Sequence, residues 1–152
     1  MSKQLDAIMK PKSIAVIGAS TKEKTIGSEV MKRLKEYGFN GDVYPVNPKA
    51  DAIEGFKAYK SILDIPGSVD LAIIIIPRKF VLDAIDQCHE KGITGVCIIS
   101  AGFKESGEDG AQAEKELALI TLQYPSHSNN LLTIYLLSHI HKLQPQKTDL
   151  NY

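Results

Sequence analysis

The chain has 152 residues, of which 43% are hydrophobic and 24% are charged, and its formal net charge at neutral pH is zero. This length and composition predict a soluble globular protein with one core. With no basic excess, no apolar run of membrane-spanning length and no signal peptide, we expect a cytoplasmic protein without a nucleic-acid or membrane partner.

Strand and helix signals alternate through the first part of the chain. Residues 13–17 (SIAVI) form a short apolar run that ends at Gly18, which is typical of a buried parallel strand. Apolar residues at helical spacing predict a helix at about residues 25–37, where a glycine follows as a stop. A second strand is expected at residues 42–46, and residues 61–66 (SILDIP) predict one short helical turn.

The alternation continues through the second part. Residues 70–76 (DLAIIII) give the clearest strand signal, because every residue after the aspartate is apolar and a proline follows. A helix with one apolar face should end at Gly92, a further strand should occupy residues 95–100, and residues 111–120 favour a helix. Fully apolar strands that alternate with helices predict an α/β fold, a Rossmann-like doubly wound parallel sheet.

The C-terminal tail differs in composition from the rest. From residue 125 onward it contains no glycine, alanine or glutamate, yet it carries three of the four histidines. The His139/His141 pair has no cysteine, aspartate or glutamate close by in sequence, so we predict no metal site. The apolar stretch LLTIYLLSHIHKL could form a helix or a strand. We therefore divide the chain into a domain at residues 5–120 and an atypical tail at residues 121–152, which is either disordered or covers the sheet edge.

Ligands of open parallel sheets bind outside the carboxyl ends of the strands, so the residues after each strand are the candidate site. Each of these residues also has an explanation that needs no ligand. Gly18 could make a tight turn, Ser20 or Thr25 could cap the helix, and the lysines could be surface charges. Their shared position favours a phosphate site at this edge, with Gly27 opening the helix beyond it, and no catalytic residue is predicted. The candidates are Gly18, Ala19, Ser20, Thr21 and Lys22, then Asn47, Pro48 and Lys49, then Pro77, Arg78 and Lys79, and finally Ser100, Ala101 and Gly102.

The identity of the phosphorylated ligand depends on two departures from the dinucleotide fingerprint. Gly18 and Gly27 are nine residues apart, which makes the loop VIGASTKEKTIG longer than the tight G-x-G-x-x-G turn. NAD-binding proteins carry a carboxylate after the second strand, whereas this chain carries Lys49. A cation there suits a ligand with an additional phosphate, such as coenzyme A or NADP, and the residues alone favour coenzyme A without excluding NADP.

Three segments together resemble a known family: SIAVIGASTKEKTIG, VYPVNPKADAIEGFKAYKSILDIPGSVDLAIIIIP and GVCIISAGFKESGEDGAQAEKEL. They are similar to the coenzyme A-binding domain of ADP-forming acetyl-CoA (acyl-CoA) synthetases, which is related to the first domain of the succinyl-CoA synthetase α subunit. The resemblance covers roughly residues 5–119. It is specific, because the NP pair after the second strand and the SAGF-E-G-G pattern after the fourth recur together in that family.

The resemblance implies coenzyme A as the ligand and assigns roles by motif. Residues 18–21 would hold its phosphates through backbone N–H groups and a hydroxyl. Residues 47–49 would lie along the adenosine-phosphate part, with Lys49 as the salt-bridge donor. Ile76, Pro77 and Arg78 would flank the adenine or the start of the pantetheine arm, and Ser100, Ala101 and Gly102 would line the path of that arm towards the thiol.

The sequence departs from the family after residue 119. The family's further strand and its Gly-Pro-Asn turn are not matched, so we expect the sheet to lack its usual last strand. The phosphohistidine and ATP-grasp domains are not recognised either, so we expect this chain to bind coenzyme A or acyl-CoA without catalysing the reaction alone, and a partner in trans could supply those domains. Two alternatives stay open: an NADP-binding Rossmann protein, and a remnant of a protein acyltransferase that carries this domain as a regulatory part.

Overall fold

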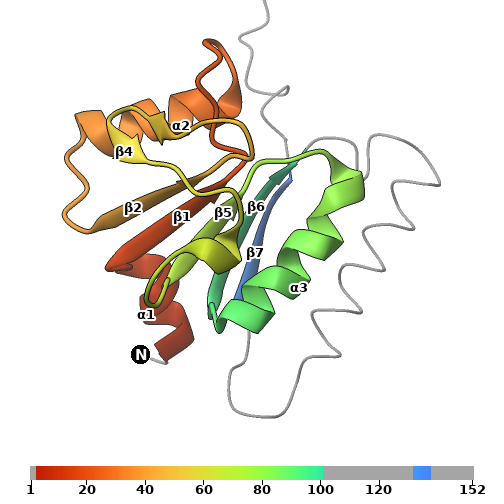
Figure 1. The fold of residues 1–152 in the computed structure, drawn as a ribbon. Helices are drawn as coiled ribbons and strands as arrows, with labels where there is room; N and C mark the ends of the chain where they lie inside the picture. Colours follow the sequence, from red (N-terminus) through yellow and green to blue (C-terminus); the bar gives the residue numbers. More distant parts are fainter. Residues whose placement is uncertain (1–2, 101–131, 138–152) are drawn as a thin grey trace, which may run out of the picture.

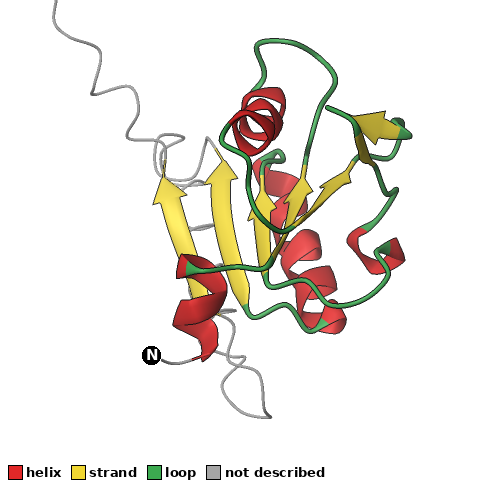
Figure 2. Cartoon of the chain, turned by 90° about the vertical axis from the view of Figure 1, so that its left-hand side faces the viewer, coloured by secondary structure: helices red, strands yellow, loops and turns green. Residues whose placement is uncertain are grey.

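Five parallel strands form the central sheet in the computed structural model, which describes residues 3–100 and 132–137. Their order in the sheet is β2-β1-β5-β6-β7, and Figures 1 and 2 show them side by side with helices on both faces. The predicted Rossmann-like doubly wound sheet is therefore confirmed. The strands are β1 (Ser13–Ile17), β2 (Asp42–Val46), β5 (Leu71–Ile74), β6 (Gly95–Ser100) and β7 (Leu132–Leu137).

The two long helices begin and end close to the predicted positions. Helix α2 (Ile26–Glu36) is capped by Thr25, whose side chain accepts a hydrogen bond from the backbone N–H of Ser28. Helix α3 (Val81–Lys91) ends at Gly92, which adopts a left-handed conformation with φ of 80°. Helix α1 (Lys3–Met9) at the N-terminus was not predicted, whereas the expected turn at residues 61–66 contains the 3-10 helix η1 (Ile62–Asp64).

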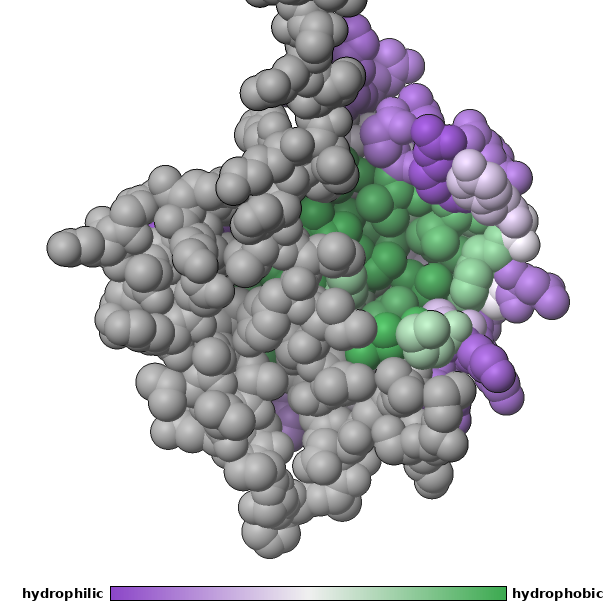
Figure 3. All heavy atoms as spheres, turned by 180° about the vertical axis from the view of Figure 1, so that it is seen from behind, coloured by the Kyte–Doolittle hydropathy of each residue, from purple (hydrophilic) through white to green (hydrophobic). Residues whose placement is uncertain are grey.

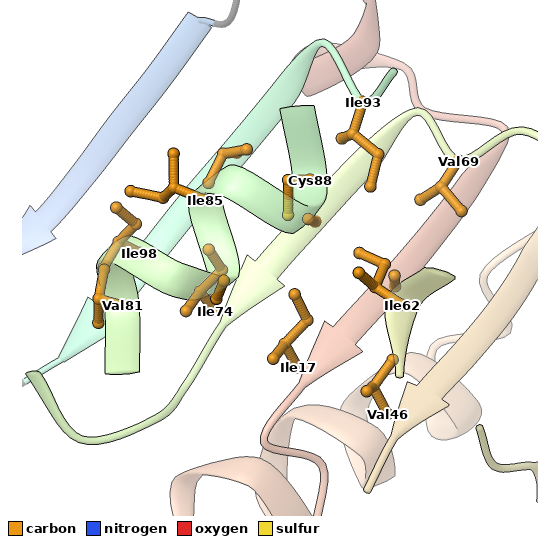
Figure 4. Packing of buried hydrophobic residues seen from close by; sticks show 14 of the residues in the cluster. Ile17, Val46, Ile62, Val69, Ile74, Val81, Ile85, Cys88, Ile93 and Ile98 are labelled. Atoms are coloured by element: carbon orange, nitrogen blue, oxygen red, sulfur yellow. The ribbon is translucent and has the colours of Figure 1, made fainter. Parts of the chain in front are cut away.

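Alternate residues of the strands build a separate apolar core on each face of the sheet. On the α3 face, Ile17 and Ile74 pack with Ile85 and Cys88 of the helix (Figure 4). On the other face, Ile14 and Val16 pack with α2. Figure 3, a view from behind, shows apolar side chains gathered at the centre, with polar ones along the upper right. Both helices therefore stay on the sheet through buried apolar surface, which fixes where the loops between them emerge.

Two features differ from the prediction in the middle of the chain. Strand β5 is shorter than residues 70–76, because the chain leaves the sheet after Ile74 and runs through Pro77 into the 3-10 helix η2 (Arg78–Phe80). A hairpin of β3 (Ala52–Ile53) and β4 (Phe56–Lys57) was not predicted. Its turn residues Glu54 and Gly55 both have positive φ, as a type I′ turn requires, but glutamate is an uncommon residue there.

Strand β7 comes from the tail and pairs in parallel with the full length of β6, from Gly95 opposite Leu132 to Ser100 opposite Leu137. The sequence of the tail was compatible with a helix or a strand, and residues 132–137 form a strand. This strand pairs with the outer side of β6. The predicted helix at residues 111–120, the domain boundary at residue 120 and the histidines of the tail lie outside the described residues.

Candidate functional site

The candidate site lies where the sheet order reverses. Strand β1 is followed in sequence by β2 on one side of it, and the chain then crosses to β5 on the other side. Because ligands of doubly wound sheets bind at this switch point, outside the carboxyl ends of the strands, the relevant loops follow β1, β2 and β5. These are three of the four places that the sequence singled out.

Two glycines allow the loop after β1 to lie close to its neighbours, the loop after β5 and the start of α2. Gly18 has φ of +96°, and a Cβ on it would lie 1.9 Å from the carbonyl oxygen of Ile75. A Cβ on Gly27, at the start of α2, would lie 2.1 Å from the carbonyl oxygen of Gly18. No side chain fits at such distances, so both glycines are required by packing, whatever the loop binds.

The loop between these glycines is folded onto the start of α2. Ser20 Oγ accepts from the backbone N–H of Lys22 at 3.0 Å, and Thr25 Oγ1 donates to the carbonyl of Lys22 at 2.9 Å. Ala19 is buried, whereas Thr21 and Lys22 are exposed. The helix cap predicted at Ser20 or Thr25 is therefore made by Thr25, while Ser20 stabilises the turn before it.

Asn47 ties the loop after β2 to the loop after β1. Its Nδ2 donates to the carbonyl of Ala19 at 2.8 Å, and its Oδ1 accepts from the backbone N–H groups of Lys49 and Ala50 at 2.8 and 3.0 Å. Three of the hydrogen bonds that an asparagine side chain can make are thus used inside the protein. Asn47 positions both loops, and this role accounts for its side chain without a ligand.

A pocket of about 340 Å³ opens beside these loops, on the face of the sheet covered by η1 and α3. Its volume falls in the range of small-ligand sites. Ile17, Val46 and Ile62 line it and belong to the buried cluster shown in Figure 4. The other lining residues are Gly18, Asn47, Pro48, Lys60, Ser61, Ile76, Phe80, Asp83, Ala84 and Gln87.

The pocket brings together Gly18, Asn47, Pro48 and Ile76 from the predicted site. The other predicted residues lie elsewhere. Ala19 to Lys22 belong to the adjoining loop, Lys49 and Pro77 are exposed, Arg78 is half-buried in η2, and Ser100 ends β6. Ala101 and Gly102 lie outside the described residues.

Besides aliphatic core residues, the pocket contains five polar or aromatic residues that were not singled out from the sequence: Lys60, Ser61, Phe80, Asp83 and Gln87. Lys60 and Ser61 come just before η1, Phe80 ends η2, and Asp83 and Gln87 lie on α3, so none of them directly follows a strand. Asp83 and Gln87 are four residues apart, so they share one flank of a helix whose apolar face was recognised. Only the packing of α3 beside the β2 loop turns that flank into a pocket wall.

The charged groups near the pocket are mostly basic. Lys22 and Lys49 are exposed, and the exposed Lys60 lies 3.6 Å from Asp51 Oδ1 in an ion pair. Among the described residues, no group of three or more histidine, cysteine, aspartate or glutamate side chains could hold a metal ion. Cys88 lies on the buried face of α3, where burial raises the pKa of its thiol to about 12, so the thiol stays protonated at neutral pH.

None of the described helices is long and apolar enough to cross a membrane.

Comparison with known proteins identifies the family of the chain. The family described as a CoA binding domain matches residues 12–123. The α subunit of acetate–CoA ligase (ADP-forming) II from Pyrococcus furiosus is 54% identical over 120 residues, which are 79% of this chain and 26% of that protein. The chain thus spans about a quarter of the length of that curated relative.

Solved structures agree in sequence and in fold. A crystal structure from Pyrococcus horikoshii matches with a TM-score of 0.73 and 56% identity, over 79% of this chain and 27% of that one. The dinucleotide forming acetyl-coenzyme A synthetase 1 of Ca. Korarchaeum cryptofilum, solved in complex with phosphate and ADP, matches with a TM-score of 0.74 and 40% identity, over 81% of this chain and 26% of that one. The chain therefore belongs to the CoA binding domain family, and it matches the part of ADP-forming acetyl-CoA synthetases that contains this domain.

Proposed function

We propose that this chain binds coenzyme A or acyl-CoA across the carboxyl ends of β1, β2 and β5. The observation that carries the proposal is the coincidence of the family match with a pocket at the switch point of the sheet. The loop at residues 18–25 lies beside the start of α2, where a phosphate is stabilised by the helix dipole. The backbone N–H groups of Gly18 and Ala19 donate to the carbonyls of Val46 and Val16, so the donors that we propose for the phosphates are the N–H groups of Ser20 and Thr21. The pocket beside it takes the adenosine end.

Lys49 is the proposed partner of the additional phosphate on the ribose. It is exposed, and its backbone is held by Asn47, so the side chain begins from a fixed position next to the pocket. Coenzyme A and NADPH both carry such a phosphate, and the family match favours coenzyme A. Ile76, Pro77 and Arg78 would follow the ligand out of the pocket, and residues 100–102 would follow its pantetheine arm.

The wider role that we propose is the coenzyme-binding part of an ADP-forming acyl-CoA synthetase. Relatives named acetate–CoA ligase (ADP-forming) from Pyrococcus furiosus support this role at 54% and 48% identity. In such a reaction, this chain would hold coenzyme A while other domains or subunits carry the phosphate and the nucleotide. Its contribution would be to bind and orient the coenzyme.

Isothermal titration with coenzyme A, dephospho-CoA and NADPH tests the ligand. We expect coenzyme A to bind most tightly, with a loss of about tenfold for dephospho-CoA, because one charge-assisted contact is removed. Lys49→Ala should weaken coenzyme A by a similar factor and leave dephospho-CoA almost unchanged. Lys10→Ala is the control, because Lys10 is exposed but lies before β1, at the amino ends of the strands and away from the proposed site.

Tighter binding of NADPH than of coenzyme A would reject the proposed ligand. Equal binding of coenzyme A and dephospho-CoA would reject the proposed role of Lys49 but not the proposed ligand.

A further inference from the structure

On one wall of the pocket, the polar side chains of Ser61, Gln87 and Asp83 are joined by hydrogen bonds. Gln87 Nε2 donates to Asp83 Oδ2 at 3.0 Å, and Ser61 Oγ donates to Gln87 Oε1 at 3.3 Å. Ser61 Oγ in turn accepts from the backbone N–H of Leu63 at 3.2 Å, as the cap of η1. All three side chains line the pocket, although no motif of the sequence pointed to them.

These contacts fix which polar atom faces which way. A carboxylate only accepts hydrogen bonds, so the amide nitrogen of Gln87 must face Asp83, and the amide oxygen then faces the hydroxyl of Ser61. Gln87 Nε2 has a second hydrogen, and Asp83 has a second oxygen. This pair of side chains can thus offer a ligand one N–H donor from Gln87 and, beside it, one oxygen acceptor from Asp83.

Apolar groups border this polar pair. Phe80 is 50% exposed and lines the pocket with Ile76 and Pro48. A half-exposed aromatic ring beside aliphatic surface is a suitable stacking surface for a flat heteroaromatic ring. The pocket therefore combines apolar contacts with a carboxylate–amide pair that can read the edge of a base.

We infer that Asp83 and Gln87 make the pocket selective for adenine. The inference rests on the proposed function, since it takes the base of the bound coenzyme as the occupant. Adenine carries an amino group next to a ring nitrogen, so it donates to the carboxylate of Asp83 and accepts from the amide of Gln87. Hypoxanthine has a carbonyl in place of the amino group, and that oxygen would meet the Asp83 carboxylate without a hydrogen between them.

The test compares coenzyme A with deamino-coenzyme A, in which hypoxanthine replaces adenine. The protein should bind coenzyme A at least about tenfold more tightly, as a correct bidentate contact to a base provides. Asp83→Asn should reduce this preference to within about threefold, because an amide can also donate to the carbonyl. Glu90→Gln neutralises another exposed carboxylate of α3 outside the pocket and should keep the full preference.

Melting curves of both variants identify any loss of folding, and the comparison of the two ligands on the unaltered protein does not depend on the variants. If coenzyme A binds but the unaltered protein binds deamino-coenzyme A within threefold of it, the inference is overturned and the proposed function stands. A full preference retained in a folded Asp83→Asn protein overturns the role of Asp83. Failure to bind coenzyme A at all overturns the proposed function and this inference together.

Discussion

Asn47 and Gly18 define the candidate site at the scale of single residues. Asn47 holds the backbone of two loops through three hydrogen bonds, and Gly18 lets the β5 loop approach to a distance that excludes a Cβ. Neither role requires a ligand, yet both shape the loops that we propose as the coenzyme site. A polar residue at the end of a strand can therefore act on binding through the loops it fixes.

Replacement of Asn47 should affect stability and binding together. Asn47→Ala removes the partners of the Ala19 carbonyl and of two backbone N–H groups, which should lower the free energy of unfolding by about 1–3 kcal/mol. Asn47→Asp keeps the acceptor for the two N–H groups but loses the donor to Ala19 and adds negative charge near the proposed phosphate. We expect it to weaken coenzyme A binding more than its effect on stability would suggest.

Urea unfolding and calorimetric titration of both variants provide the measurements. Unchanged unfolding of Asn47→Ala would show that the loops do not depend on this side chain.

At the scale of elements, strands β2 and β6 find backbone partners on their outer sides in different ways. Next to β2, the backbone of Tyr59 donates to the carbonyl of Pro45 and accepts from the N–H of Asn47. Pro45 lacks an N–H of its own, which is tolerated because this side of β2 is not paired with a full strand. Next to β6, strand β7 from the tail provides the pairing, along six residue pairs.

Removal of β7 should destabilise the protein. Loss of the backbone hydrogen bonds along β6 should lower the free energy of unfolding by on the order of 3 kcal/mol, and the melting temperature by roughly 10 °C. The measurement is the difference in melting temperature between a chain that ends before Pro125 and one that ends at residue 138, because only the first lacks β7. Equal melting of the two truncated chains would contradict a stabilising role of this strand.

At the scale of the whole molecule, the described residues place the five-stranded sheet between two apolar cores, and both cysteines belong to these cores. Cys88 is buried on the α3 face, and Cys97 is partly buried on the other face. Burial raises the pKa of both thiols, because a thiolate would lose its hydration there. Folding is therefore coupled to the protonation of these groups at alkaline pH.

Stability should fall as the pH rises above 9. The pKa of Cys88 is raised from 9.0 to about 12, so the unfolded chain releases the proton at lower pH than the folded protein does. Stability from this group is complete below pH 9 and is lost as the pH rises towards 12. Between pH 8 and pH 10 the free energy of unfolding should decrease by roughly 1.4 kcal/mol through Cys88 alone.

Urea unfolding at several pH values measures this decrease. Cys88→Ala should be less stable at pH 8, because it leaves a cavity, but should show a weaker dependence on pH. The dependence that remains would come from groups such as Cys97 and Tyr44, whose pKa values are also raised, in both cases with burial as the largest cause. Parallel decreases in the two proteins would exclude Cys88 as the source.

Sequence patterns were sufficient to predict the fold class, the two long helices and the side of the sheet at which the candidate site lies. These features follow from local signals: apolar runs, helical spacing from Ile26 onward, and stop signals such as Gly92. The family was also recognisable, because its motifs lie in the loops directly after the strands. The hairpin escaped prediction because its turn uses Glu54 in a left-handed conformation that sequence rules assign to asparagine or aspartate.

The contacts between side chains of different elements could be known only from the three-dimensional structure. In the structure, β7 pairs with β6, and the side chain of Asn47 donates a hydrogen bond to the Ala19 carbonyl. Ser61 and Gln87, which are 26 residues apart in sequence, also form a hydrogen bond. Periodicity reports which face of an element is buried, but it does not report which other element lies against that face. The pocket wall was therefore invisible in the sequence, since α3 and η1 form it only when both pack on the same side of the sheet.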